Sequence, residues 1–122
     1  SKQPFKQLSE IKSNYKLVVF GASWCPKCNE DIPHLTSFYQ KWKEDYKLEI
    51  VFISLDTQKK EYDIFVKNFP WISSCDFKGW ESQPAIDYCV FGTPTMYLLN
   101  KEHKILLKPV SPEQIETWLQ YQ

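Results

Sequence analysis

The stretch from residue 16 to residue 28, KLVVFGASWCPKC, joins a run of apolar residues to two cysteines separated by two residues. A continuous apolar run that ends in small residues is typical of a strand buried on both faces, as in a parallel sheet. Cys25 follows the end of this strand, and Cys28 falls in the first turn of the helix expected next. This placement determines the predicted chemistry of the two thiols.

Two thiols at the start of a helix favour a redox centre. Backbone N–H groups and the positive end of the helix dipole stabilise a thiolate, which is the form that attacks a disulfide. The spacing lets the second thiol reach the mixed disulfide that the first one forms and release the substrate. We therefore expect Cys25 to be an exposed nucleophile and Cys28 to be the resolving thiol, partly covered by the helix. Lys27 is expected to add positive charge, and Trp24 to shield one side of the site.

The other interpretations of the cysteines are a zinc site and structural crosslinks. A four-cysteine zinc site usually needs two close pairs, whereas Cys75 and Cys89 are separated by 13 intervening residues. A purely structural crosslink between Cys25 and Cys28 would close a very small loop and stabilise little. For Cys75 and Cys89 three interpretations stay open: small buried hydrophobic residues, a disulfide across the 71–89 segment, and a second redox pair.

The rest of the chain alternates predicted strands with predicted helices. Pro33 lies inside the helical pattern that follows Cys28, so we expect a kink about one turn beyond that cysteine. Ser111 and Pro112 begin a last helix as its N-cap and first residue. Between these helices the pattern predicts a strand over 48–55, a helix over 58–69, a weak strand over 71–75, a short helix over 83–88 and a hairpin over 95–107.

This order predicts an α/β fold in which a central mixed sheet is covered by helices on both faces, in three layers. At 122 residues the chain fits a single domain over 1–122. Phe5, Leu8, Ile11 and Tyr15 recur at helical spacing, so we expect a helical extension over residues 1–13 at the N-terminus.

Composition excludes some classes of function. Fifteen basic and fifteen acidic residues give a net charge of zero, and no basic stripe predicts nucleic-acid binding. The longest apolar runs are far too short to cross a membrane, and no signal peptide is visible. We therefore expect a domain that neither inserts into a membrane nor binds nucleic acid.

The Trp-Cys-Pro-Lys-Cys sequence at residues 24–28, Pro33, and the Gly-Thr-Pro-Thr sequence at 92–95 together resemble the thioredoxin superfamily. The similarity covers residues 14–122. It is greatest to the TlpA/ResA-like branch, whose members often carry Y-x-V-x-G-x-P-T. In this chain that pattern corresponds to Tyr88, Val90, Gly92, Pro94 and Thr95.

The resemblance implies a thioredoxin-like fold and a thiol–disulfide oxidoreductase whose only redox group is the Cys25–Cys28 disulfide, with no metal and no other cofactor. It implies that Pro94 is cis and packs against the two cysteines, and that the Thr93 backbone pairs with an incoming protein substrate. Trp24, Pro26 and Lys27 would complete the substrate-binding surface. It further implies a monomeric reductant outside the cytoplasm, in the periplasm or anchored to a membrane, that a membrane electron donor keeps reduced.

The sequence departs from the family pattern at one acidic position. Many thioredoxins carry a buried aspartate six residues before the nucleophile, where this chain has Val19. Some ResA-like proteins use an acid just after the second strand instead, and Asp56 lies within about a residue of that place. We hypothesise that Asp56 accepts a proton from Cys28.

Two other functions would fit the same fold. A thiol peroxidase of the peroxiredoxin type would need a cysteine near a threonine and an arginine, and the candidate cations in this chain are all lysines. A non-catalytic binding module would carry its CxxC without using it. His34 and His103 are interpreted as surface or capping residues. Trp71, Trp80 and Phe91 are candidates for a groove that receives a partner.

Overall fold

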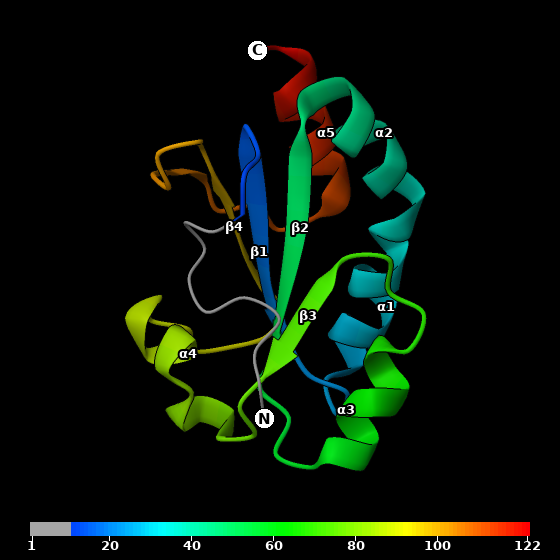
Figure 1. Ribbon diagram of the computed structural model, residues 1–122, viewed down its shortest axis with the longest axis vertical. Helices are drawn as coiled ribbons and strands as arrows, with labels where there is room; N and C mark the ends of the chain where they lie inside the picture. The colour runs from blue at the N-terminus through cyan, green and yellow to red at the C-terminus, as the bar shows by residue number, and fades with distance from the viewer. Residues whose placement is uncertain (1–10) are drawn as a thin grey trace.

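The computed structural model describes residues 11–122, which form a five-stranded sheet with helices on both faces (Figure 1). The strands lie in the order β3-β2-β1-β4-β5. β1, β2 and β3 run parallel, and β4 and β5 are antiparallel to their neighbours. The strands are β1 (Tyr15–Gly21), β2 (Leu48–Ser54), β3 (Ile72–Cys75), β4 (Thr95–Leu99) and β5 (Ile105–Leu107). The predicted mixed α/β sheet is therefore confirmed.

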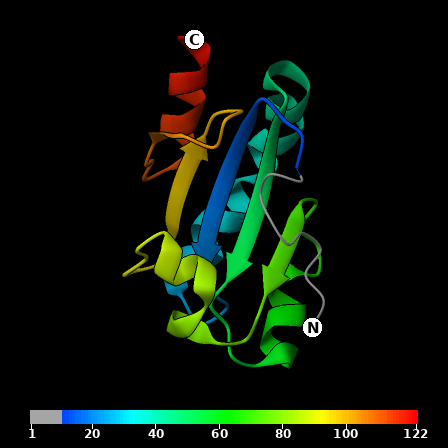
Figure 2. The ribbon, with the colours of Figure 1, turned by 60° about the vertical axis from the view of Figure 1, so that its left-hand side comes forward.

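Alternation along β1 divides the core into two halves. Leu17 and Val19 point into a cluster formed with α1 (Pro26–His34), α2 (Thr36–Tyr46), α3 (Lys59–Val66) and α5 (Pro112–Gln120). Val18 and Phe20 point to the other face, which α4 (Gln83–Asp87) covers. Figure 2 shows α4 on the side of the sheet opposite to α2. Successive strand residues face opposite sides, so one buried strand supplies both halves of the core.

The helix after the cysteines is interrupted, as Pro33 predicts. α1 ends at His34 and α2 begins at Thr36, with Leu35 between them. The last helix begins as expected, because the Ser111 hydroxyl accepts a hydrogen bond of 3.2 Å from the backbone N–H of Gln114. The strand over 72–75, the short helix over 83–87 and the β4–β5 hairpin also lie where the sequence predicts them.

The predicted N-terminal helix is wrong for the part of it that the structure describes. Residues 11–14 are not helical, and Tyr15 is already the first residue of β1, paired with Leu48. The Tyr15 ring packs on Trp118 of α5, with ring centroids 6.0 Å apart. Sheet pairing therefore overrides the helical spacing, and residues 1–10 of the expected extension lie outside the described residues. α3 is also shorter than expected, since it ends at Val66.

Candidate active site

Cys25 and Cys28 form a disulfide at the junction between β1 and α1, with their Cα atoms 5.2 Å apart. Cys25 is the N-cap residue of α1, and its Sγ accepts a hydrogen bond of 3.2 Å from the backbone N–H of Cys28. An N-cap side chain satisfies one of the unpaired N–H groups of a helix start. The same N–H group is positioned to stabilise an anionic sulfur at residue 25 once the disulfide is reduced.

Both cysteines are buried in this oxidised form. Cys28 is fully buried, and Cys25 is only 4% exposed. The expected order of accessibility therefore holds, but the expectation of an exposed Cys25 is wrong for the disulfide. Its sulfur is held in the core cluster below α1, where Ile32 and Leu35 also lie.

The loop that carries Cys25 is fixed by two polar side chains that the sequence did not identify. The Asn29 side-chain amide donates to the carbonyl oxygens of Ser23 and Cys25, at 2.9 and 2.8 Å. Ser23 donates from its hydroxyl to Asp56, at 2.5 Å. Asn29 directly follows the CxxC, so its position in the first turn of the helix could have predicted this contact with the loop. Ser23 gave no signal, because its partner is 33 residues away.

Lys27 is exposed and forms an ion pair of 2.9 Å with Asp31, one turn further along α1. This contact raises the pKa of the Lys27 ammonium, chiefly through the hydrogen bond to Asp31. The positive charge expected beside the thiols is thus compensated by a neighbouring carboxylate.

The peptide bond between Thr93 and Pro94 is cis. Thr93 and Pro94 line a depression of about 270 Å³ together with Lys27 and Lys108. The structure therefore brings the Gly-Thr-Pro segment next to the CxxC helix across about 65 residues of sequence. Thr95 stabilises the turn before β4 by donating its hydroxyl to the carbonyl oxygen of Gly92, at 2.7 Å.

Aromatic side chains flank the site on its other side. Trp24 is half exposed and packs on the half-exposed Trp80, with ring centroids 6.1 Å apart. Trp80 and the highly exposed Phe91 also line a depression of about 440 Å³. Trp71 does not belong to this surface, because it is buried against Tyr39 and Phe69. Of the three aromatic candidates, two are placed where a partner could reach them.

Asp56 is only 1% exposed and accepts several hydrogen bonds. Its carboxylate receives the backbone N–H of Ser23 at 3.2 Å, the Ser23 hydroxyl, and the Ser54 hydroxyl at 2.6 Å. Among the hydrogen bonds of residues 11–122, none joins this carboxylate to Cys25 or Cys28. In this geometry Asp56 anchors the loop before the nucleophile, and its role as a proton acceptor remains a hypothesis.

Val19 and Gly21 complete the apolar surroundings of Cys28. Val19 is fully buried in the same core cluster as Cys25 and Cys28. A Cβ atom on Gly21 would lie 3.1 Å from the Cys28 sulfur and 2.6 Å from Cδ1 of Ile32. The absence of a side chain at Gly21 therefore makes room for Cys28.

Cys75 and Cys89 are both free, so no disulfide joins them in this structure. Their interpretation as a second redox pair stays a prediction, because two free thiols are also the reduced form of such a pair. Cys75 is buried, its Sγ lies 3.3 Å from the carbonyl oxygen of Asp56, and burial raises the pKa of its thiol. Cys89 is exposed and has a positive φ of 55°. The interpretation as a small buried residue thus holds for Cys75 and is wrong for Cys89.

The histidines lie away from the dithiol chemistry. His34 pairs with Glu113 of α5 at 2.7 Å on the surface, and His103 occupies the β4–β5 turn, as expected. In the part of the chain from 11 to 122, no group of three or more histidine, cysteine or acidic side chains is arranged to hold a metal ion. No helix in this range is long and apolar enough to cross a bilayer.

Comparison with known proteins agrees with this site. The thioredoxin-like family model matches residues 13–105. Thiol-disulfide oxidoreductase ResA of Bacillus cereus is 30% identical over an aligned length of 125 residues, gaps included. The match covers 93% of this chain and 66% of ResA. The chain thus spans slightly less than two thirds of that relative.

Solved structures give the same result. A thiol-disulfide oxidoreductase from Bacteroides fragilis has a TM-score of 0.80 and 29% identity, covering 88% of this chain and 80% of the other. A putative thiol:disulfide interchange protein DsbE from Chlorobium tepidum has a TM-score of 0.79 and 26% identity, covering 93% and 83%. The chain belongs to the thioredoxin-like family, and it is similar to domains of thiol–disulfide oxidoreductases.

Proposed function

We propose that the protein reduces disulfides in protein substrates outside the cytoplasm, with Cys25 as the nucleophile and Cys28 as the resolving thiol. The observation that carries this assignment is the hydrogen bond from the Cys28 N–H to the Cys25 sulfur at the start of α1. It distinguishes the two sulfurs, because the helix start stabilises negative charge on residue 25.

The reaction uses only the dithiol and the substrate disulfide. The Cys25 thiolate attacks one substrate sulfur, the substrate S–S bond breaks, and the released substrate thiolate takes up a proton. Cys28 then loses its proton and attacks the Cys25 sulfur of the mixed disulfide. The second substrate thiolate leaves, so two electrons pass from the protein dithiol to the substrate. No further cofactor takes part.

Two features support the direction of electron flow. Cys25 is almost completely buried, and Lys27 is compensated by Asp31 at 2.9 Å. Burial disfavours a charged thiolate, and a compensated lysine stabilises it less than a free one would. A less stabilised dithiol favours the disulfide form, which is the property of a reductant.

The substrate would bind across the surface formed by Trp24, Pro26, Lys27, Thr93 and the cis Pro94. The shared depression beside Lys27 and Pro94 supports this arrangement, with the Thr93 backbone pairing with an extended substrate chain. The resemblance to the TlpA/ResA-like branch supports an extracytoplasmic monomer that a membrane dithiol donor re-reduces.

The test is to trap the mixed disulfide with Cys28→Ser. This variant should accumulate a substrate joined to Cys25, and mass spectrometry would identify it. Cys25→Ser should trap nothing and should fail to reduce insulin. Cys89→Ser is the control, because it removes an exposed thiol outside the CxxC and should leave insulin reduction unchanged.

The same experiments separate the alternative functions. A binding module would leave wild-type protein unable to reduce insulin, while Cys25→Ser would retain its partner. A thiol peroxidase would consume peroxide without any reductase partner. Titration of the wild-type couple against glutathione would then determine whether the protein is a donor or an acceptor of electrons.

A further inference from the structure

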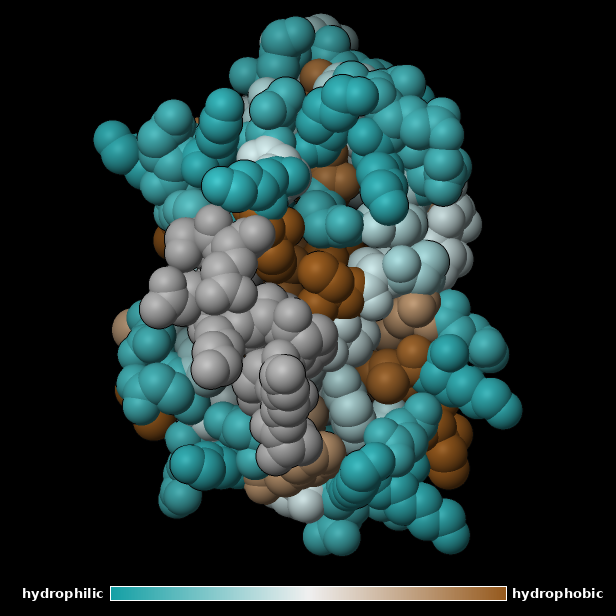
Figure 3. All heavy atoms as spheres, in the orientation of Figure 1, coloured by the Kyte–Doolittle hydropathy of each residue, from teal (hydrophilic) through white to brown (hydrophobic). Residues whose placement is uncertain are grey.

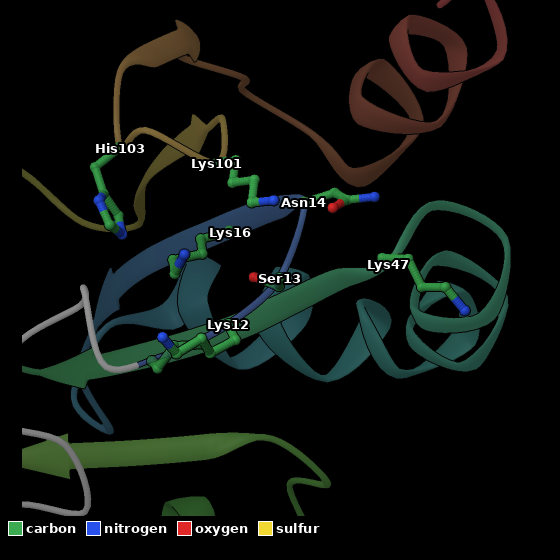
Figure 4. Close-up of a pocket in the computed structure, with 8 residues that line it drawn as sticks. Lys12, Ser13, Asn14, Lys16, Lys47, Lys101 and His103 are labelled. Atoms are coloured by element: carbon green, nitrogen blue, oxygen red, sulfur yellow. The ribbon is translucent and has the colours of Figure 1, made fainter.

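A basic pocket lies at the end of the sheet opposite to the dithiol. Cys25 follows the C-terminal end of β1, whereas the pocket surrounds the start of that strand, about 17 Å away at the usual rise of a strand. Its volume is about 460 Å³. Figure 4 shows the side chains that line it. Its basic lining residues are Lys12, Lys16, Lys47, Lys101 and His103, and no acidic side chain lines it among the described residues.

Lys16 is the unusual member of this lining. It lies in the central strand β1, on the same face as the buried Val18 and Phe20. Its residue is only 1% exposed, and burial lowers the pKa of its ammonium. A buried charge without a partner is strongly unfavourable, and lysine is almost never fully buried unless it is paired.

The acid nearest to Lys16 in the sheet register does not serve as its partner. Glu49 is paired with Lys16 across β1 and β2. Its carboxylate accepts hydrogen bonds from the Tyr39 hydroxyl and, at 3.1 Å, from the backbone N–H of Ile50. Within residues 11–122, none of the four pocket lysines forms an ion pair.

The pocket also contains a buried polar atom without a hydrogen-bond partner among the described residues. Nε2 of His103 is buried and makes no hydrogen bond to any described residue. Its turn is rigid, because the Asn100 side-chain oxygen accepts the backbone N–H groups of Glu102 and Lys104, both at 2.9 Å. Figure 4 shows the His103 and Lys16 side chains on the same side of the pocket.

The opposite wall is held in place by backbone hydrogen bonds. The carbonyl oxygen of Lys47 accepts the N–H groups of Asn14 and Tyr15, at 2.9 and 3.3 Å. The Ser13 hydroxyl donates to the carbonyl oxygen of Tyr15, at 2.9 Å. The pocket is thus built from three segments that hydrogen bonds fix before any ligand arrives. Figure 3 shows hydrophilic side chains gathered around this end of the molecule.

We propose that this pocket binds the phosphate group of a ligand, either a small phosphorylated molecule or a lipid headgroup. A phosphate monoester carries a charge of about −1.5 to −2 near neutral pH. Several lysine ammonium groups around one cavity match that charge, and lysine binds phosphate as a point charge. The volume exceeds that of a single phosphate, so the ligand would extend beyond it. This proposal is independent of the dithiol chemistry.

The first experiment titrates ¹⁵N-labelled full chain with inorganic phosphate, with sodium chloride adjusted to hold the ionic strength constant. We expect amide shifts confined to residues 13–16, 47 and 100–104. Lys16→Met should weaken phosphate binding at least tenfold, and Lys101→Ala should weaken it severalfold. Lys60→Met, at an exposed lysine of α3, is the matched control and should change the affinity less than twofold.

A second experiment distinguishes the two sources of phosphate by cosedimentation with vesicles. Binding to phosphatidylglycerol vesicles but not to phosphatidylcholine vesicles, lost in Lys16→Met, supports a lipid headgroup. Amide shifts with free phosphate but no vesicle binding support a small molecule. The proposal is overturned if neither probe binds, or if Lys60→Met weakens binding as much as Lys16→Met does. Lys101→Ala provides the decisive comparison should Lys16→Met fail to fold.

Discussion

The two ends of the sheet each contain a buried charged residue, and the structure treats them in opposite ways. At the dithiol end, Asp56 receives hydrogen bonds from the backbone and hydroxyl of Ser23 and from Ser54. At the other end, Lys16 is equally buried and has no ion-pair partner among residues 11–122. Buried charge is stabilised only where donors or acceptors surround it. The contrast is consistent with a structural role for Asp56 and with the phosphate site proposed at Lys16.

The largest expected effect comes from removing the carboxylate at the dithiol end. Asp56→Ala leaves the Ser23 N–H and the Ser23 and Ser54 hydroxyl groups without their acceptor. We therefore expect the free energy of unfolding to fall by about 3 kcal/mol. Urea denaturation at pH 7 would measure this loss. Asp45→Ala is the control, since Asp45 is exposed on α2 and should change stability by less than about 0.5 kcal/mol.

Asp56→Asn tests the chemical role of the same residue separately. A proton acceptor for Cys28 would make resolution of the mixed disulfide slower in this variant and change its pH profile. An unchanged profile would leave Asp56 with the positioning role alone. The reference is the wild-type rate measured over the same pH range.

The next largest loss of stability is expected from crowding the core around Cys28. Gly21→Ala would place a Cβ 2.6 Å from Ile32 and 3.1 Å from the Cys28 sulfur. Overpacking of a core typically costs about 1–3 kcal/mol, and the shift at Cys28 should also slow insulin reduction. Gly92→Ala is the matched control near the site, because its Cβ would meet nothing within 4 Å. Equal destabilisation by both variants would contradict this account.

At the other end of the sheet, removing the buried charge is expected to stabilise the protein instead of destabilising it. Lys16→Met removes a buried charge and keeps most of the side-chain volume, so we expect stability to rise by about 1 kcal/mol at pH 7. The pKa of Lys16 is lowered from 10.5 by burial, so the unfolded chain binds the proton more tightly and the folded state is penalised. This penalty is complete below the folded pKa and disappears as the pH rises toward 10.5.

Thermal unfolding from pH 7 to about pH 11 would therefore show the advantage of Lys16→Met shrinking as the pH approaches 10.5. Lys60→Met should show no such dependence. Added phosphate should reduce or reverse the advantage, because the wild type binds phosphate more tightly and gains more stability from it. If Lys16→Met is less stable than the wild type in phosphate-free buffer, the buried Lys16 charge does not destabilise the folded protein and this account is wrong.

The smallest expected effect comes from a partly buried carboxylate on α5. Glu116 of α5 accepts hydrogen bonds from Lys41 and from the Trp42 ring N–H, both at 2.6 Å, and these lower its pKa. Its contribution is present above the unfolded pKa and is lost as the pH falls through the lowered folded pKa. We expect Glu116→Gln to cost about 0.5 kcal/mol at pH 7 and nothing at acidic pH, as urea denaturation would measure.

Local sequence was sufficient for much of the fold and for the dithiol. The apolar run before the CxxC predicted β1, Pro33 predicted the break between α1 and α2, and Ser111 predicted the start of α5. These features depend on backbone restrictions and on residue periodicity within one or two turns, so nearby residues determine them. Cys25 and Cys28 belong to this group because a helix start is itself a local feature.

The tertiary structure alone decided which distant groups meet. The sheet order β3-β2-β1-β4-β5 places Asp56 on Ser23 and the β4–β5 turn beside Lys16, and it buries Cys75 while leaving Cys89 exposed. It also turned Tyr15 from an expected helix residue into a strand residue. Burial and partnership of a charge depend on segments brought together by packing, and no periodicity within one segment encodes them.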